Sequence, residues 1–285
     1  MNVALFAALT LRELVRRKLV VAVAILIAII IAFTGWGLYR LAHAIVNGAP
    51  IAQPGVRATA AGIVMLLAFL FTFVLALGAA LVGAPALAES VANGEILALL
   101  ARPVRRADVV AGRWLGTVIA LVVFVACAGG AELFVVRAMT GYVPPHPLVA
   151  LGYLSGVAAV VATAAIALAS RLPALAAGIV AALLFGLAWI GGIVQSIGQL
   201  FGNASLADAG TLMSLVFPSD ALWRGALFAL QPAVFTAANA AANANAVPNP
   251  FGVTAPPPLA MLWWSAGWIA AAFAAAIALF RTRDL

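Results

Sequence analysis

The chain has little charge, one cysteine and two histidines. Only 8% of its 285 residues are charged, and the single cysteine, Cys127, excludes a disulfide within the chain. The histidines, His43 and His146, stand far apart in the sequence, which excludes a close-spaced zinc pair of the HExxH kind. We therefore expect no metal site.

Motifs for nucleotide binding and nucleophilic catalysis are also missing from the sequence. The one lysine, Lys18, follows Arg17 instead of the glycine that precedes the lysine of a phosphate-binding P-loop. There is no G-x-S-x-G nucleophile elbow. We expect no catalytic residue and no cofactor in this chain, so any ATP that drives it is bound by another polypeptide. A membrane enzyme is the least favoured class of function.

Apolar residues, in contrast, make up 66% of the chain, and the mean hydropathy is +1.19. Both values lie far outside the range of soluble domains. A helix needs about 20 apolar residues to cross a bilayer, and six runs have about that length: 19–38, 58–83, 115–136, 148–169, 174–194 and 259–280. The alternating pattern of a membrane barrel is absent from the sequence. We predict an all-α integral membrane protein with six transmembrane helices in a single transmembrane domain, 1–285.

The distribution of basic residues predicts the orientation, because short loops rich in arginine and lysine stay in the cytoplasm. With the N-terminus inside, eleven basic residues fall on the cytoplasmic side and four fall outside. The outer four are Arg40, Arg57, Arg137 and Arg224. We therefore expect both termini to be cytoplasmic. Residues 86–113 then form a cytoplasmic segment, and residues 195–258 form a long extracytoplasmic one.

Residues 1–18 combine apolar positions at broadly helical spacing with charged residues between them. This pattern favours an amphipathic helix on the inner membrane surface. A simple basic anchor for the first span is the alternative.

The cytoplasmic segment has an unusual concentration of charge. The stretch "ESVANGEILALLARPVRRADVVAGRW" at 89–114 contains three acidic residues and four arginines. A break at Asn93 and Gly94 and the proline at position 103 delimit a short helix over 95–101, with an apolar face of isoleucine and leucine. A solvated loop does not need such a face, so we predict a docking element for a cytoplasmic partner. An ordinary surface linker is the alternative.

In the outer segment we predict a short helix over 221–230, capped at its N-terminus by Ser219 or Asp220. Its apolar side chains would dip into the outer membrane interface. The helix either covers the outer mouth as a gate or lies on the surface as an anchor. The low-complexity stretch "TAANAAANANAVPNP" at 236–250 is expected to be mobile. The candidate gate residues are Pro218, Asp220, Trp223 and Arg224.

Glu132 is the one ionisable residue within a membrane run, four positions before its outer end. Ionisable groups there are costly and are usually functional. Arg137 is five positions on, which is poorly aligned for a helical pair. Glu132 is therefore a possible intramembrane polar site for substrate or protons, with an interfacial structural role as the alternative.

Three stretches resemble the permease subunits of ABC type 2 transporters, a family that includes many bacterial exporters and the permease serving nitrous-oxide reductase maturation. They are "GEILALLARPVRRADVVAGRWLG", "VFPSDALWRGALFAL" and the ending "ALFRTRDL". The six-span plan and the basic start agree with the family over the whole length. Two departures concern the docking stretch: Glu95 stands where the family usually has a small hydroxyl residue, and the acidic stretch before it is reduced to Glu89.

The resemblance implies that the helix around 95–102 is a coupling helix, which inserts into a cleft of an ABC ATP-binding subunit. Two such subunits would bind ATP and Mg, and a second copy of this chain or a related permease would complete the pathway. The protein would lie in a bacterial or archaeal cytoplasmic membrane, in contact with lipid and not with nucleic acid. The implied coupling residues are Glu89, Gly94, Glu95, Leu99, Leu100, Arg102, Pro103, Arg105 and Arg106.

The resemblance places the second and fifth spans along the pathway. Their stretches "IVMLLAFLFTFVLALG" and "ALAAGIVAALLFGLAWIGGIV" contain Thr72 and Trp189 as their only hydrogen-bonding side chains. Burying a polar solute there without partners costs several kcal/mol per group. We therefore expect export of a hydrophobic or amphipathic substrate. An ATP-independent secondary carrier or channel is the alternative function.

Overall fold

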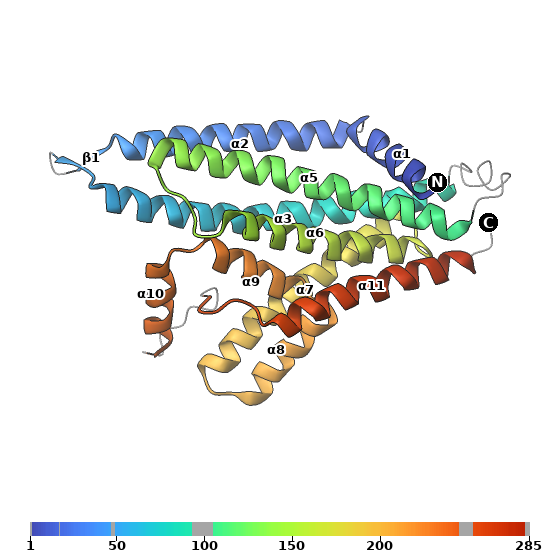
Figure 1. Ribbon diagram of the computed structural model, residues 1–285. Helices are drawn as coiled ribbons and strands as arrows, with labels where there is room; N and C mark the ends of the chain where they lie inside the picture. Colours follow the sequence, from blue (N-terminus) through green and yellow to red (C-terminus); the bar gives the residue numbers. More distant parts are fainter. Residues whose placement is uncertain (1, 17, 47–48, 93–104, 245–252, 283–285) are drawn as a thin grey trace.

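The computed structural model describes residues 2–16, 18–46, 49–92, 105–244 and 253–282, and almost all of them are helical (Figure 1). Two short antiparallel strands form a small hairpin between α2 and α3, with Ile45 opposite Pro50. The elements are α1 (Asn2–Arg16), α2 (Lys18–Ala42), β1 (Ile45–Val46), β2 (Ala49–Pro50), α3 (Gln53–Ala92), α5 (Arg106–Thr140), α6 (Pro147–Ala169), α7 (Ala174–Leu200), α8 (Ala204–Val216), α9 (Ser219–Leu230), α10 (Ala233–Ala244) and α11 (Leu259–Arg281).

Six helices, α2, α3, α5, α6, α7 and α11, are long and apolar enough to cross a membrane. Each predicted apolar run lies within one of them, so the all-α membrane fold is confirmed. Helices α3 and α5 contain 40 and 35 residues. At 1.5 Å per residue they are roughly 60 and 52 Å long, well beyond the ~30 Å of a hydrocarbon core. They therefore extend out of the membrane.

Helix α6 is the centre of the bundle and contacts α3, α5, α7, α9 and α11. Nearly every side chain from Val157 to Ile166 is buried. Many of these residues are alanines, and small side chains let helix backbones approach closely in lipid. Helices α2 and α11 lie at the periphery and leave most of their apolar side chains exposed, as lipid-facing helices do.

The predicted helix near the N-terminus is present as α1, and it packs against the first turns of α5. Two glycines of α5 make this contact possible. A Cβ at Gly112 would lie 2.3 Å from the Phe6 Cβ, and one at Gly116 would lie 2.7 Å from the Ala7 carbonyl oxygen. Helix α1 begins and α11 ends at the same end of the bundle, opposite the strand hairpin (Figure 1). The location of α1 on a membrane surface stays a prediction.

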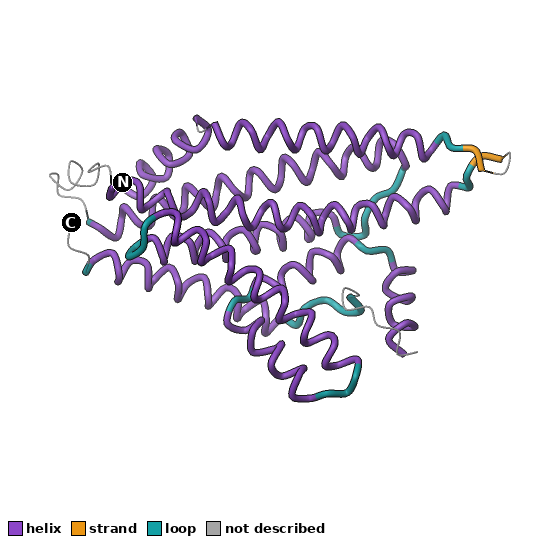
Figure 2. Tube along the Cα trace, turned by 180° about the vertical axis from the view of Figure 1, so that it is seen from behind, coloured by secondary structure: helices purple, strands orange, loops and turns teal. Residues whose placement is uncertain are grey.

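The predicted outer segment is more structured than the sequence suggested. Helix α7 continues to Leu200, and α8 folds back along it to form a hairpin that projects obliquely from the bundle in both views (Figures 1 and 2). Residues 236–244 belong to the helix α10, whereas the mobility expected of 236–250 stays a prediction. Alanine has the highest helix propensity, and this stretch is alanine-rich. The remaining positions, 245–250, lie outside the described residues.

Candidate functional site

Helix α9 turns back into the bundle and packs mainly against α6. Nine of its twelve residues are buried, whereas a helix lying on a membrane surface would leave one face exposed. The predicted boundaries, 221–230, are close to those observed. The predicted N-cap is wrong, because Pro218 occupies that position without a side-chain hydrogen bond. Asp220 is instead one turn away from Arg224 and pairs with it.

Two adjacent glycines of α7 allow α8 and α9 to approach it. A Cβ at Gly192 would lie 2.2 Å from the Asp220 Oδ1, and a Cβ at Gly191 would lie 2.5 Å from the Met213 Cβ. Neither distance is tolerated by real Cβ atoms, so only glycine permits this packing. The C-terminal end of α7 thus supports α9 and its charged residues.

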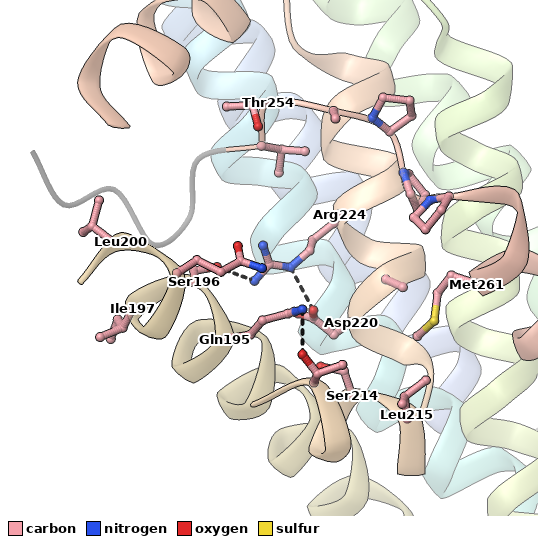
Figure 3. Close-up of a pocket in the computed structure, with 18 residues that line it drawn as sticks. Gln195, Ser196, Ile197, Leu200, Ser214, Leu215, Asp220, Arg224, Thr254 and Met261 are labelled. Carbon is pink, nitrogen blue, oxygen red and sulfur yellow. Dashed lines mark hydrogen bonds and ion pairs between the residues drawn. The ribbon is translucent and has the colours of Figure 1, made fainter. Parts of the chain in front are cut away.

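Arg224 hydrogen-bonds to two groups of α7 and pairs with Asp220 within α9; the contacts with Asp220 and Ser196 are drawn in Figure 3. Its Nε donates to the Asp220 Oδ2 at 2.8 Å, and its Nη2 donates to the Gly192 carbonyl oxygen at 2.5 Å and to the Ser196 Oγ at 3.0 Å. Burial raises the pKa of the Asp220 carboxyl group, while the charge and hydrogen bond of Arg224 lower it in part. Arg224 therefore offsets the cost of burying a carboxylate whose side chain is only 3% exposed.

A cavity of about 610 Å³ lies beside this network, between α7, α8, α9 and the segment that leads into α11 (Figure 3). Its lining is rich in hydrogen-bonding groups. Gln195 Nε2 donates to the Thr211 Oγ1 at 3.0 Å, and the buried Ser214 Oγ has no hydrogen-bond partner within the described part of the chain. The cavity can therefore hold water or the polar part of a solute.

The four predicted gate residues lie on α9 or at its start but face different surroundings. Asp220 and Arg224 line the polar cavity. Trp223 faces the core, where its ring lies edge-on to Phe69 with centroids 6.1 Å apart. Pro218 is buried at the turn that precedes α9. The structure thus brings two of the four to the cavity, and Trp223 anchors the helix.

Sequence reasoning missed Gln195, Ser196, Thr211 and Ser214, which make up half of the polar side chains in the lining. A signal was present in "GGIVQS", where two glycines at the end of an apolar run are followed by two polar residues. The glycines indicate close helix contact, and the polar residues lie one turn beyond them. Helix α8 has its own start signal, because Asn203 caps it by accepting a hydrogen bond from the Leu206 N–H at 3.1 Å.

At the opposite end of the bundle, only the edges of the predicted coupling segment can be placed. Arg105 is exposed just before α5, and Arg106 Nη1 donates to the Arg281 carbonyl oxygen at 3.2 Å, at the end of α11. Glu89 belongs to the last turns of α3, but its side chain is outside the described part. The other predicted coupling residues lie outside the described residues: Gly94, Glu95, Leu99, Leu100, Arg102 and Pro103.

Arg113, near the end of the charged stretch 89–114, is buried with only 3% of its surface exposed. It forms an ion pair with Glu13, and its Nη1 lies 3.5 Å from the Thr10 Oγ1. Both partners belong to α1. Arg113 therefore fastens α1 to α5 and is not presented to a partner protein.

Glu132 lies in the wall of a second cavity, formed mainly by α2, α3, α5 and α6. Its Oε1 atom is buried and has no hydrogen-bond partner among the described residues. Arg137 is exposed and does not line this cavity, in agreement with the expectation that the two residues do not pair.

Comparison with known protein families finds one match. Residues 6–285 match the family described as the ABC-2 family transporter protein. The match covers nearly the whole chain, so it depends on the succession of helices and connecting segments and not on one short motif. Among curated proteins, no match is found.

Proposed function

Because this chain belongs to the ABC-2 family of transporter proteins, we propose that it is the membrane-spanning permease of an ATP-driven exporter. Two separate ATP-binding subunits, which carry ATP and Mg, dock on the end of the bundle where α1 begins and α11 ends. Two copies of the chain, or one copy and a related permease, form the pathway. The membrane is the cytoplasmic membrane of a bacterium or archaeon. The similarity to the nitrous-oxide reductase maturation permease stays a prediction.

The family match over residues 6–285 is the observation that carries the proposal. The geometry supports a way of transmitting force. Residues 93–104 connect α3 and α5, the two longest helices, and both pack against the central α6. A displacement of that connection by a docked subunit would move both helices as rigid bodies, the usual form of such transitions.

Helix α9 is proposed to be the outer gate. It lies inside the outer end of the bundle, and the Arg224 network holds it to α7. Opening requires that this network separate from α7. In a chain whose native cysteine is replaced by alanine, we expect nucleotide to change the labelling rate of Ala221→Cys, which faces the polar cavity. Ser205→Cys, exposed on α8, is the control. Equal labelling of Ala221→Cys with and without nucleotide would remove the gate.

The apolar interior formed by α3 and α7, which pack against α9, supports a hydrophobic or amphipathic substrate. Thr72 is buried but donates to the Ala68 carbonyl oxygen at 2.7 Å, within its own helix. On the same helix, Phe69 and Phe73 pack edge to face, and Phe73 packs edge to face with Trp189 of α7. A polar solute would lose hydrogen bonds to water there, whereas an apolar one gains about 25 cal/mol per Å² removed from water.

The substrate class can be tested on the complex of this chain with its ATP-binding subunit in lipid. We expect hydrophobic compounds to raise ATP hydrolysis above the basal rate and polar compounds of similar size to leave it unchanged. Stimulation confined to polar solutes or metal ions would contradict the substrate class. Failure to isolate any nucleotide-binding subunit with the chain from native membranes would contradict the proposed function itself.

A further inference from the structure

The cavity beside Glu132 has a volume of about 210 Å³ and an otherwise apolar lining. At one end are Glu132 and the adjoining ends of α6 and α9. From there the cavity extends along α3 toward Phe71 and Val74. An apolar cavity of about 150 Å³ is large enough for benzene. This one therefore accommodates a single ring or a short branched chain with a few additional carbons.

The cavity is open on its membrane side. Leu26 and Ile30 of α2 and Leu70 of α3 line it, and their side chains are 49%, 39% and 51% exposed. Helix α2 packs chiefly against α5 and only weakly against α3, which leaves the opening between α2 and α3. A compound dissolved in the lipid could enter by this route without crossing the polar surface of the protein.

The carboxyl group of Glu132 has an unmet requirement. Its Oε1 is buried without a partner in the described part of the chain. Thr34 is a hydrogen-bonding neighbour, but its single hydroxyl proton is already donated to the Ile30 carbonyl oxygen at 2.9 Å. A buried carboxyl group without a donor or a counter-charge is strongly unfavourable.

No basic side chain lines the cavity among the residues that the structure describes. The nearest arginine along α5, Arg137, is exposed and outside the lining. Within the described part of the chain, no cationic side chain is therefore placed to compensate the Glu132 carboxylate, and a bound cation could do so. Water could satisfy the carboxyl group, but the rest of the lining is apolar and favours an apolar body over water.

We propose that this cavity binds a small hydrophobic cation, with its ammonium group on the Glu132 carboxylate and its apolar body between α2, α3 and α5. An ammonium group supplies both the donor and the opposite charge that the carboxylate lacks. The apolar lining selects against hydrophilic cations, and the single carboxylate selects against anions. The inference relies on the proposed function only for the later fate of the bound compound, since binding needs no ATP-binding subunit.

The test compares phenylbutylamine with phenylbutanol, which have the same apolar body and differ in the head group. Binding is measured by calorimetry on the full chain in lipid nanodiscs, and empty nanodiscs correct for partition into lipid. We expect saturable binding of the amine, which is protonated at neutral pH. Glu132→Gln is nearly isosteric. It should weaken the affinity for the amine by roughly tenfold or more, as expected for a desolvated charge pair, and change the affinity for the alcohol by no more than about twofold.

Two further variants separate the site from general effects. Ala128→Phe places a ring in the cavity and should abolish binding of both compounds without changing any charge. Asp208→Asn removes an exposed carboxyl group on α8 and should change neither. Amine binding unchanged in Glu132→Gln, or equal to that of the alcohol in the wild type, would overturn the proposal. Amine binding unchanged in Ala128→Phe would place the site elsewhere and would also overturn it. A protein that binds the amine as proposed but shows no ATP dependence of transport would contradict only the proposed function.

Discussion

At the scale of single residues, the most demanding feature is the buried Asp220 carboxylate with Arg224 beside it. The Asp220 side chain is 3% exposed and the Arg224 side chain is 22% exposed. Loss of either partner leaves a charge without compensation, and the free-energy cost is larger for the more deeply buried carboxylate. Arg224 of this pair also hydrogen-bonds to Gly192 and Ser196 of α7, so its loss affects both stability and the position of the proposed gate.

We predict that Arg224→Gln lowers the free energy of unfolding by about 3 kcal/mol, the lower part of the range for breaking a buried pair. It should also make stability depend on pH. Burial raises the pKa of Asp220, and the variant lacks the Arg224 charge that opposes this. A carboxyl group with a raised pKa in the folded state binds its proton more tightly there, so stability falls as pH rises through that pKa. Thermal unfolding in detergent at several pH values measures both effects.

The matched control is the double variant Asp220→Asn with Arg224→Gln, which has no carboxyl group at the site. It should be more stable at neutral pH than Arg224→Gln alone and should lack the added pH dependence. If Arg224→Gln is as stable as the wild type across the pH range, the network does not hold α9.

Tyr142 supports the other end of α9. It lies in the segment that connects α5 to α6 and is buried there. Its hydroxyl donates to the Leu230 carbonyl oxygen at 3.0 Å. Burial raises the pKa of Tyr142 from 10.0 to about 12. Stability should therefore be unaffected by this group below about pH 10 and should fall as the pH rises from about 10 to about 12.

We predict that Tyr142→Phe destabilises the protein by about 1–3 kcal/mol, because the Leu230 carbonyl oxygen loses its donor. The loss of stability between about pH 10 and 12 should be smaller in this variant than in the wild type. Unfolding midpoints of the two proteins across this range provide the measurement. Identical curves would mean that the hydroxyl group makes no net contribution.

At the scale of helices, glycines determine which elements touch. The structure places Gly192 and Gly191 against α9 and α8, and Gly112 and Gly116 against α1. The G-x-x-x-G pair in α6 behaves differently. Gly156 meets Leu222 of α9, with a Cβ placed 3.3 Å from its Cδ1, whereas Gly152 has no neighbour within 4 Å. Within the described part of this chain, only one of these two glycines makes a close contact between helices.

Gly192→Ala tests whether the approach of α9 to α7 is as close as described. The added Cβ meets the Asp220 carboxyl group at 2.2 Å, so either this carboxyl group must turn away from its place beside Arg224 or the helices must separate. We expect a loss of about 1–3 kcal/mol, as for overpacking in a core. Gly186→Ala on the same helix is the control, because no atom lies within 4 Å of its Cβ, and it should be neutral or slightly stabilising. Equal unfolding midpoints for the two variants would refute this packing.

The sequence was sufficient to locate elements but not to locate their contacts. Apolar runs predicted six spans because each must satisfy its own backbone in lipid, and all six are present. The polar cavity could not be predicted in the same way. Gln195 is on α7 and Thr211 is on α8, and a turn joins the two helices. Their contact depends on α8 folding back along α7. The position of α9 inside the bundle depends on the contact of Gly192 with Asp220. No local sequence pattern identifies these two residues as neighbours.

At the scale of the whole molecule, charge is concentrated at the end of the bundle where docking is proposed. Arg105 is exposed there, and Arg106, Arg171 and Arg281 are near the ends of α5, α6 and α11. Arg171 also donates to the Thr282 Oγ1 at 2.5 Å, which connects the end of α6 to the end of α11. Basic residues at this end are suited to an acidic partner surface.

Reversing the charge of Arg105 and Arg106 should therefore weaken binding of the ATP-binding subunit and leave the fold unchanged. We expect Arg105→Glu with Arg106→Glu to lower co-purification of the ATP-binding subunit, and to make the remaining association less sensitive to salt. The unfolding midpoint should change little, because Arg105 is exposed and Arg106 is only partly buried. Arg57→Glu, exposed at the start of α3 at the opposite end, is the control and should not alter co-purification. If both variants recover equal amounts of the ATP-binding subunit, the segment with Arg105 and Arg106 is an ordinary surface linker.

The central claim is that a separate subunit energises this chain, and the most direct test is ATP-dependent transport by the reconstituted complex. The chain and its ATP-binding subunit are placed in vesicles, and accumulation of a stimulating hydrophobic compound is followed with ATP and Mg on the docking side. We predict accumulation that requires ATP and both proteins, and that stops when the partner's P-loop lysine is replaced by alanine. Full transport by this chain alone, without ATP, would contradict the account and would favour a secondary carrier or channel.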